Sequence, residues 1–145
     1  MKLLPEGLDF DGPFPRLSRR LRLGIAGGGR IAVTQAMAAR MSDHWEVVAG
    51  ALSSNPDNAA ARAAEFRIAP ERSYASFEDM AEAEARHPEG VDAVMITTPN
   101  HLHHAAARAF LTAGIDVLCD KPLTNEISEA EDLVGLASAS GCVFG

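Results

Sequence analysis

Two kinds of hydrophobic pattern alternate along this sequence. Short, almost uninterrupted apolar runs, as expected for strands buried on both faces, occupy 21–26, 45–52, 91–97 and 115–119. Longer segments with apolar and small residues at helical spacing predict helices over 30–41, 56–66, 77–86, 101–113 and 128–140. A short extended piece near 72–74 and the beginning of another strand at 142–144 complete the series.

The residues at the segment boundaries support this division. Asn55 followed by Pro56 is typical of an N-cap and the first helical position. Ser76, with Asp79 three residues later, resembles a capping box. Gly114 ends the helix predicted over 101–113.

Strands and helices in alternation predict an α/β fold with a doubly wound parallel sheet (a Rossmann fold). Parallel strands need crossover connections, and each crossover packs a helix against the sheet. We expect one domain over 21–145, whose sixth strand is truncated at the C-terminus.

Residues 1–20 form an N-terminal extension to this domain. Five prolines and glycines within the first 15 residues rule out a helix there, and Arg16, Arg19 and Arg20 follow as a basic cluster. The segment is either an extended arm that lies on the domain or a disordered leader, and the sequence leaves both open.

Composition narrows the class of partner. The chain has 145 residues, enough for one domain with a hydrophobic core, and a formal net charge of -7. Nucleic acids and anionic membrane surfaces favour basic faces, so neither is expected as a partner. No apolar stretch has the length of a membrane span or a signal peptide, which predicts a cytoplasmic protein.

A glycine-rich turn follows the first predicted strand. Gly27-Gly28-Gly29-Arg30-Ile31-Ala32 fits the pattern G-x-G-x-x-A at the opening of a helix. In this pattern Gly27 permits a tight turn, Gly29 lets the backbone approach a pyrophosphate, and Ala32 lets the helix pack closely. The turn therefore predicts dinucleotide binding, although a purely structural turn or a S-adenosylmethionine site would use similar glycines.

The end of the second strand bears on the choice of cofactor. A carboxylate there would bind the ribose 2′-hydroxyl of NAD, but this sequence has Ser53, Ser54 and Asn55. With Arg30 or Arg62 as a nearby cation, these residues favour the 2′-phosphate of NADP. Ser54 and Asn55 also suit a helix cap, so NAD and NADP both remain open, with NADP slightly favoured.

Two further motifs follow the predicted strands over 91–97 and 115–119. Thr98-Pro99-Asn100 comes first, and His101, His103 and His104 follow it; a metal site is not expected because no third ligand is evident. Asp120-Lys121-Pro122 comes second, and a lysine at that end of a strand could donate a proton or orient a substrate hydroxyl. A surface lysine before a proline is also commonplace.

Together, the segments GIAGGGRIA and TTPNHLHHAAARAFLTAGIDVLCDKPL resemble the Gfo/Idh/MocA oxidoreductases over residues 21–145. The resemblance implies a Rossmann domain followed by an α/β substrate domain, which is absent from this sequence. It places Lys121 as the catalytic lysine and Asp120 where glutamate is usual. It also implies ten cofactor-binding residues: Gly27, Gly29, Arg30, Ile31, Ser53, Ser54, Thr98, Pro99, Asn100 and His103.

The function implied is an NAD(P)-dependent oxidoreductase that moves a hydride to or from a secondary alcohol or ketone carbon of a sugar or polyol. The isolated chain is expected to be nearly inactive, and its oligomeric state has no basis for prediction. One alternative is a stand-alone module that binds or senses NAD(P) without turnover, which should complete its sixth strand. A methyltransferase domain is disfavoured because that chemistry does not need Lys121 or the TPN segment.

Overall fold

The computed structural model describes residues 17–145, so most of the predicted N-terminal extension lies outside the described residues. Five α-helices, four strands and two short 3-10 helices follow one another within that range. They are β1 (Leu21–Ala26), α1 (Arg30–Met41), β2 (Trp45–Ala51), α2 (Pro56–Glu65), η1 (Pro70–Arg72), α3 (Phe77–Arg86), β3 (Ala93–Ile96), η2 (Asn100–Leu102), α4 (His103–Thr112), β4 (Asp116–Cys119) and α5 (Ile127–Ser140).

The four strands form one parallel sheet in the order β2-β1-β3-β4. Single parallel bridges extend it on both sides, from Gly50 to Ser73 beyond β2 and from Val117 to Phe144 beyond β4. From β1 the chain first adds β2 on one side of the sheet. It then returns to the other side of β1, where it adds β3 and β4. This confirms the predicted doubly wound α/β fold.

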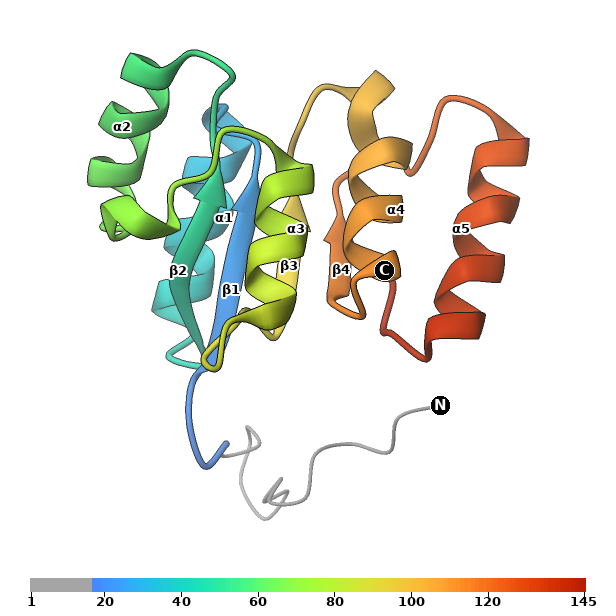
Figure 1. Cartoon of the computed structure of the whole chain (residues 1–145), viewed down its shortest axis with the longest axis horizontal. Coiled ribbons are helices and arrows are strands. Elements are labelled where there is room, and N and C mark those ends of the chain that lie inside the picture. Colours follow the sequence, from blue (N-terminus) through green and yellow to red (C-terminus); the bar gives the residue numbers. More distant parts are fainter. Residues whose placement is uncertain (1–16) are drawn as a thin grey trace.

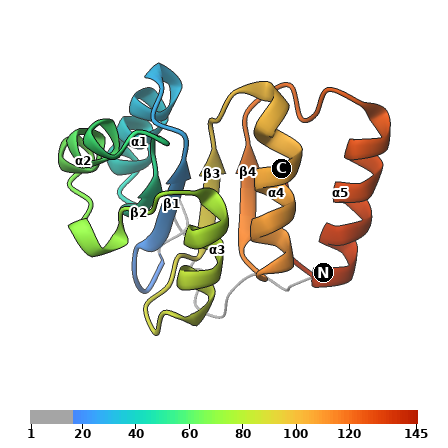
Figure 2. The ribbon, with the colours of Figure 1, turned by 45° about the horizontal axis from the view of Figure 1, so that its top comes forward.

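Helices cover both faces of the sheet (Figures 1 and 2). One core cluster joins α1 and α2 to one face through residues such as Ala36, Ala63 and Ile25. The other cluster joins α3, α4 and α5 to the opposite face, with Phe110 and Leu133 fully buried. Small side chains on the helices let them pack closely against the apolar strands.

The predicted boundaries are close to the observed ones, with two instructive differences. The predicted capping residues act as caps: Asn55 Oδ1 accepts a hydrogen bond from the Asn58 N–H at 3.0 Å, and Ser76 Oγ accepts one from the Asp79 N–H at 3.0 Å. The predicted helix over 101–113 was wrong at its start, because η2 forms first and α4 begins only at His103. The strand predicted over 91–97 is confined to Ala93–Ile96.

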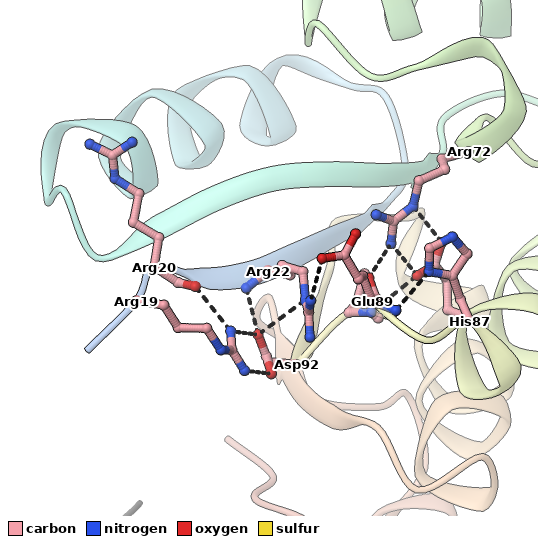
Figure 3. Close-up of polar contacts among 9 residues, drawn as sticks. Arg19, Arg20, Arg22, Arg72, His87, Glu89 and Asp92 are labelled. Atoms are coloured by element: carbon pink, nitrogen blue, oxygen red, sulfur yellow. Dashed lines mark hydrogen bonds and ion pairs between the residues drawn. The ribbon is translucent and has the colours of Figure 1, made fainter. Parts of the chain in front are cut away.

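A buried charged network joins residues 72–74, the last turn of α3 and the segment that leads into β3. Glu84, only 2% exposed, pairs with Arg72 and accepts hydrogen bonds from the Tyr74 hydroxyl at 2.8 Å and the Val91 N–H at 3.0 Å. Figure 3 shows Arg72 beside a second cluster, in which the Arg19 guanidinium binds both carboxylate oxygens of Asp92 at 2.7 Å. Residue 19, at the start of the described chain, is thereby fixed to the domain.

No helix within residues 17–145 combines the length and the apolar character needed to cross a bilayer.

Candidate functional site

The candidate site lies where the carboxyl ends of β1, β2 and β3 meet. From β1 the chain continues into α1 on one face of the sheet, and from β3 it continues into η2 and α4 on the other face (Figure 1). Connections that leave neighbouring strands in opposite directions open a crevice at this edge, and ligands of doubly wound sheets bind there. The glycine turn, the two serines and the TPN segment all border it.

Gly27 and Gly28 are required by close packing. The backbone of Gly27 has φ of +105°, and a Cβ there would lie 2.7 Å from the carbonyl group of Thr97. A Cβ on Gly28 would overlap the carbonyl oxygen of Leu52, beyond the end of β2. The first two glycines therefore allow the turn to sit directly on the ends of β2 and β3. Gly28 stood at a variable position of the motif, and only the run of three glycines pointed to it.

Gly29 differs from both, because beyond the glycine and its two chain neighbours no atom lies within 4 Å of the position where its Cβ would be. It is the N-cap residue of α1, it provides no side-chain cap, and the first turn of that helix contains no acidic residue. Arg30 and Ile31, the next two residues, are exposed. The first-turn N–H groups and the positive end of the helix dipole are therefore open to an anion.

The two serines lie beyond the end of β2. Ser53 Oγ accepts a hydrogen bond from the Asn55 N–H at 3.1 Å, while Ser54 is exposed. A groove of about 390 Å³ adjoins both serines and continues between α2 and residues 68–75. Of the two candidate cations, Arg62 is paired with Glu65 at 2.6 Å, whereas Arg30 forms no ion pair with any carboxylate of residues 17–145.

Thr97, the residue directly before the TPN segment (Thr98-Pro99-Asn100), is hydrogen-bonded to the end of β1 and to the glycine turn. Thr97 Oγ1 lies 3.2 Å from the Ala26 carbonyl oxygen and 3.3 Å from that of Gly27, to which it donates. Thr98 Oγ1 is buried and has no hydrogen-bond partner among the described residues. A buried hydroxyl without a partner is unfavourable, so this atom is a candidate for a hydrogen bond to a bound group. Pro99 and Asn100 follow and are exposed.

The side chain of His103 is buried between the loop that follows β3 and the loop that follows β4. Its side chain is 1% exposed, and its two ring nitrogens lie 2.7 Å from the Pro122 carbonyl oxygen and 2.9 Å from the Thr98 carbonyl oxygen. Both nitrogens are thus engaged with backbone. The resemblance selected this histidine, and not His101 or His104, as a residue along the cofactor, but no local pattern in the sequence indicated that its ring is buried.

Lys121 is exposed on the loop that follows β4. Its N–H donates to the Asp120 carboxylate at 2.9 Å, and the N–H of Asp120 donates to the Ile96 carbonyl oxygen at 3.0 Å. The peptide bond to Pro122 is cis. Asp120 therefore bonds its own loop, and the Lys121 ammonium takes part in none of the ion pairs found among residues 17–145.

Cys119, the last residue of β4, is the nearest thiol along the chain to that lysine. Burial, with the negative charge of Asp120 adding to it, raises the pKa of Cys119 to about 11. The thiol is thus protonated at neutral pH and is a poor nucleophile. Covalent chemistry at this loop would have to use another group.

These features fit a dinucleotide and do not suggest a metal. The open space at Gly29, the uncapped start of α1 and the unpartnered Thr98 hydroxyl all lie around the same crevice. Within residues 17–145, no three histidine, cysteine or acidic side chains are grouped so that they could hold a metal ion. The fold and this edge define the class: a dinucleotide-binding domain of Rossmann type.

Comparison with known proteins gives the family. Residues 21–145 match the oxidoreductase family with an NAD-binding Rossmann fold, and the chain belongs to that family. An inositol 2-dehydrogenase of Leifsonia xyli subsp. xyli is 37% identical over 118 residues, which is 76% of this chain and 30% of that protein.

Two crystal structures show the same fold. An oxidoreductase from Sinorhizobium meliloti is 48% identical with a TM-score of 0.83, over 87% of this chain and 36% of that one. An inositol dehydrogenase homologue from Azotobacter vinelandii, complexed with NADH and myo-inositol, is 34% identical with a TM-score of 0.84, over 88% of this chain and 35% of that one. The chain thus spans about a third of the length of these relatives.

Proposed function

We propose that this domain binds NAD(H) or NADP(H) with the pyrophosphate on the turn formed by Gly27, Gly29, Arg30 and Ile31. The observation that carries the proposal is the start of α1, where no side chain caps the helix and no atom fills the space beside Gly29. A phosphate oxygen placed there would accept hydrogen bonds from first-turn N–H groups and meet the positive end of the dipole. The cofactor bound to the Azotobacter relative supports this reading.

Ser53 and Ser54 would then lie at the adenosine ribose. Two hydroxyls can donate hydrogen bonds to a 2′-phosphate, and no carboxylate stands among residues 52–56, directly after β2, to repel it. Arg30 is the cation that we assign to this phosphate, because Arg62 is already paired with Glu65. We therefore propose a preference for NADP over NAD.

Thr98, Pro99, Asn100 and Lys121 would line the nicotinamide end of the crevice. A nicotinamide held there would supply hydride exchange with the carbon of a secondary alcohol or a ketone. Lys121 would take the hydroxyl proton during oxidation and return it during reduction. The relative that binds myo-inositol points to a polyol or sugar as the substrate class.

Calorimetric titration with NADH and NADPH tests the cofactor site and its preference. We expect the native chain to bind both, NADPH more tightly. Ser53→Asp should weaken NADPH binding about tenfold or more, because the new carboxylate repels the 2′-phosphate, and should spare NADH. The new side chain can still accept from the Asn55 N–H, so the fold should persist.

Ser53→Asn is the matched control, since it adds similar bulk without charge. It should leave the order of the two affinities unchanged. Equal loss of NADPH binding in both variants would contradict the electrostatic reading of the serines. Absence of binding to the folded native chain would contradict the cofactor site itself.

A further inference from the structure

The loops that carry the TPN segment and Lys121 leave neighbouring strands. Regular pairing between β3 and β4 ends at Ile96 and Cys119. One more backbone hydrogen bond, from the Asp120 N–H to the Ile96 carbonyl oxygen, extends the contact by a single residue. Beyond this point the positions of the two loops relative to each other depend on other contacts.

His103 supplies such a contact. From the first turn of α4, its buried ring reaches the Thr98 carbonyl oxygen on one loop at 2.9 Å and the Pro122 carbonyl oxygen on the other at 2.7 Å. A ring that carries a proton on both nitrogens donates to both carbonyls, and a neutral ring donates to one of them. Pro122 follows Lys121 directly, so this bond acts one residue from the lysine backbone.

We propose that His103 is a positioning residue, which fixes Lys121 relative to the TPN segment by joining the two loops through its ring nitrogens. The two contacts of the His103 ring are observed in the structure. The claim that they matter for hydride transfer rests on the proposed function of Lys121. In this account the ring does not contact the cofactor. The His103 ring instead keeps the Lys121 amine at a fixed position beside the residues that would line the nicotinamide.

The sequence offers a direct probe of Lys121, because it contains only two lysines, Lys2 and Lys121. Reductive ¹³C-methylation of the folded chain labels both, and a Lys2→Arg background leaves Lys121 as the one labelled lysine. Its methyl resonance in the native chain is compared with that in the urea-unfolded chain. The difference reports the fixed surroundings of the amine without any cofactor.

Three variants then separate positioning from folding. His103→Leu removes both bonds, and His103→Gln retains an amide N–H that can bind one carbonyl. Phe110→Leu perturbs the same helix two turns away, where the side chain is fully buried in the core. We expect His103→Leu to move the Lys121 resonance most of the way to the unfolded value, His103→Gln to give an intermediate value, and Phe110→Leu to leave it in place.

A native resonance position in folded His103→Leu would overturn the proposal, as would an equal shift in Phe110→Leu. If His103→Leu does not fold, His103→Gln decides, and a native position there overturns the proposal. Unfolding of both histidine variants would also overturn it, since the ring would then support the whole domain. Addition of NADH tests the proposed function separately: no change of the native Lys121 resonance would contradict cofactor binding but leave the histidine comparison intact.

Discussion

At the scale of residues, three consecutive glycines have three different reasons to be glycine. Gly27 needs a positive φ and close contact with β3, and Gly28 needs close contact with the end of β2. Gly29 needs neither, because its surroundings are open and its backbone is extended, with φ of -75° and ψ of -176°. No close contact within the fold therefore requires glycine at this position, whereas the proposed approach of a pyrophosphate would.

This difference predicts a large loss of stability for a substitution at Gly27 and almost none for one at Gly29. Gly27→Ala should lower the free energy of unfolding by at least about 2 kcal/mol, from backbone strain and overlap with the Thr97 carbonyl group. Gly29→Ala should stay within about 0.5 kcal/mol of the native value. Urea unfolding followed by circular dichroism measures both. Similar values for the two variants would show that the turn is not built as described.

A second residue-scale prediction concerns the buried Glu84. Glu84→Gln leaves the Arg72 guanidinium, whose side chain is 13% exposed, without its charged partner. Breaking such a pair should lower the free energy of unfolding by about 3 kcal/mol, because the remaining charge stays desolvated. Glu82→Gln on the same helix removes an exposed partner of Arg86 and should change stability by less than about 1 kcal/mol. Equal effects in urea unfolding would contradict the burial of the network.

At the scale of elements, the sequence predicts most boundaries because local chemistry decides them. Asn55 and Ser76 can satisfy backbone N–H groups by themselves, so the starts of α2 and α3 follow from neighbouring residues alone. The start of α4 was predicted wrongly for the converse reason. The His103 ring lies within hydrogen-bond distance of two carbonyl oxygens on different loops, and Asn100–Leu102 form a 3-10 turn directly before it.

The beginning of β1 has an electrostatic anchor that should respond to acid. Partial burial alone would raise the pKa of Asp92, but hydrogen bonds from the Arg19 guanidinium and the Arg22 N–H outweigh it and lower the pKa below its ordinary value. Because the folded value is lower, the stabilisation is complete above about pH 4 and is lost as the pH falls through the folded value.

We therefore expect Asp92→Asn to lose less stability than the native chain between pH 4 and pH 2.5, approximately, although it is less stable at pH 7. Arg19→Gln should flatten the same part of the profile, since it removes the main hydrogen-bond donor. Urea midpoints measured across this range provide the test. An acid limb in Asp92→Asn that is as steep as in the native chain would show that the pair does not act as an anchor.

At the scale of the whole molecule, the order of strands brings distant motifs to one edge. The alternating pattern predicted a doubly wound sheet, and a doubly wound sheet places the glycine turn beside the TPN segment without any further information. Long-range packing was beyond reach: neither the contact of Gly28 with Leu52 nor the inward position of His103 has a local signature. The sequence did not predict the network around Glu84 for the same reason, because its side-chain partners are up to twelve residues from Glu84 along the chain.

The central claim is that the start of α1 binds the phosphates of a nicotinamide dinucleotide. Titration of NADH fluorescence with the native chain, with Gly29→Val and with Gly135→Val tests it most directly, because outside the adjoining residues and the nearby backbone of its own helix a Cβ at either glycine meets no atom within 4 Å. We predict saturable binding by the native chain and by Gly135→Val. Binding to Gly29→Val should be at least about tenfold weaker, with an unchanged urea midpoint. Native affinity in folded Gly29→Val, or no binding to the folded native chain, would contradict the claim.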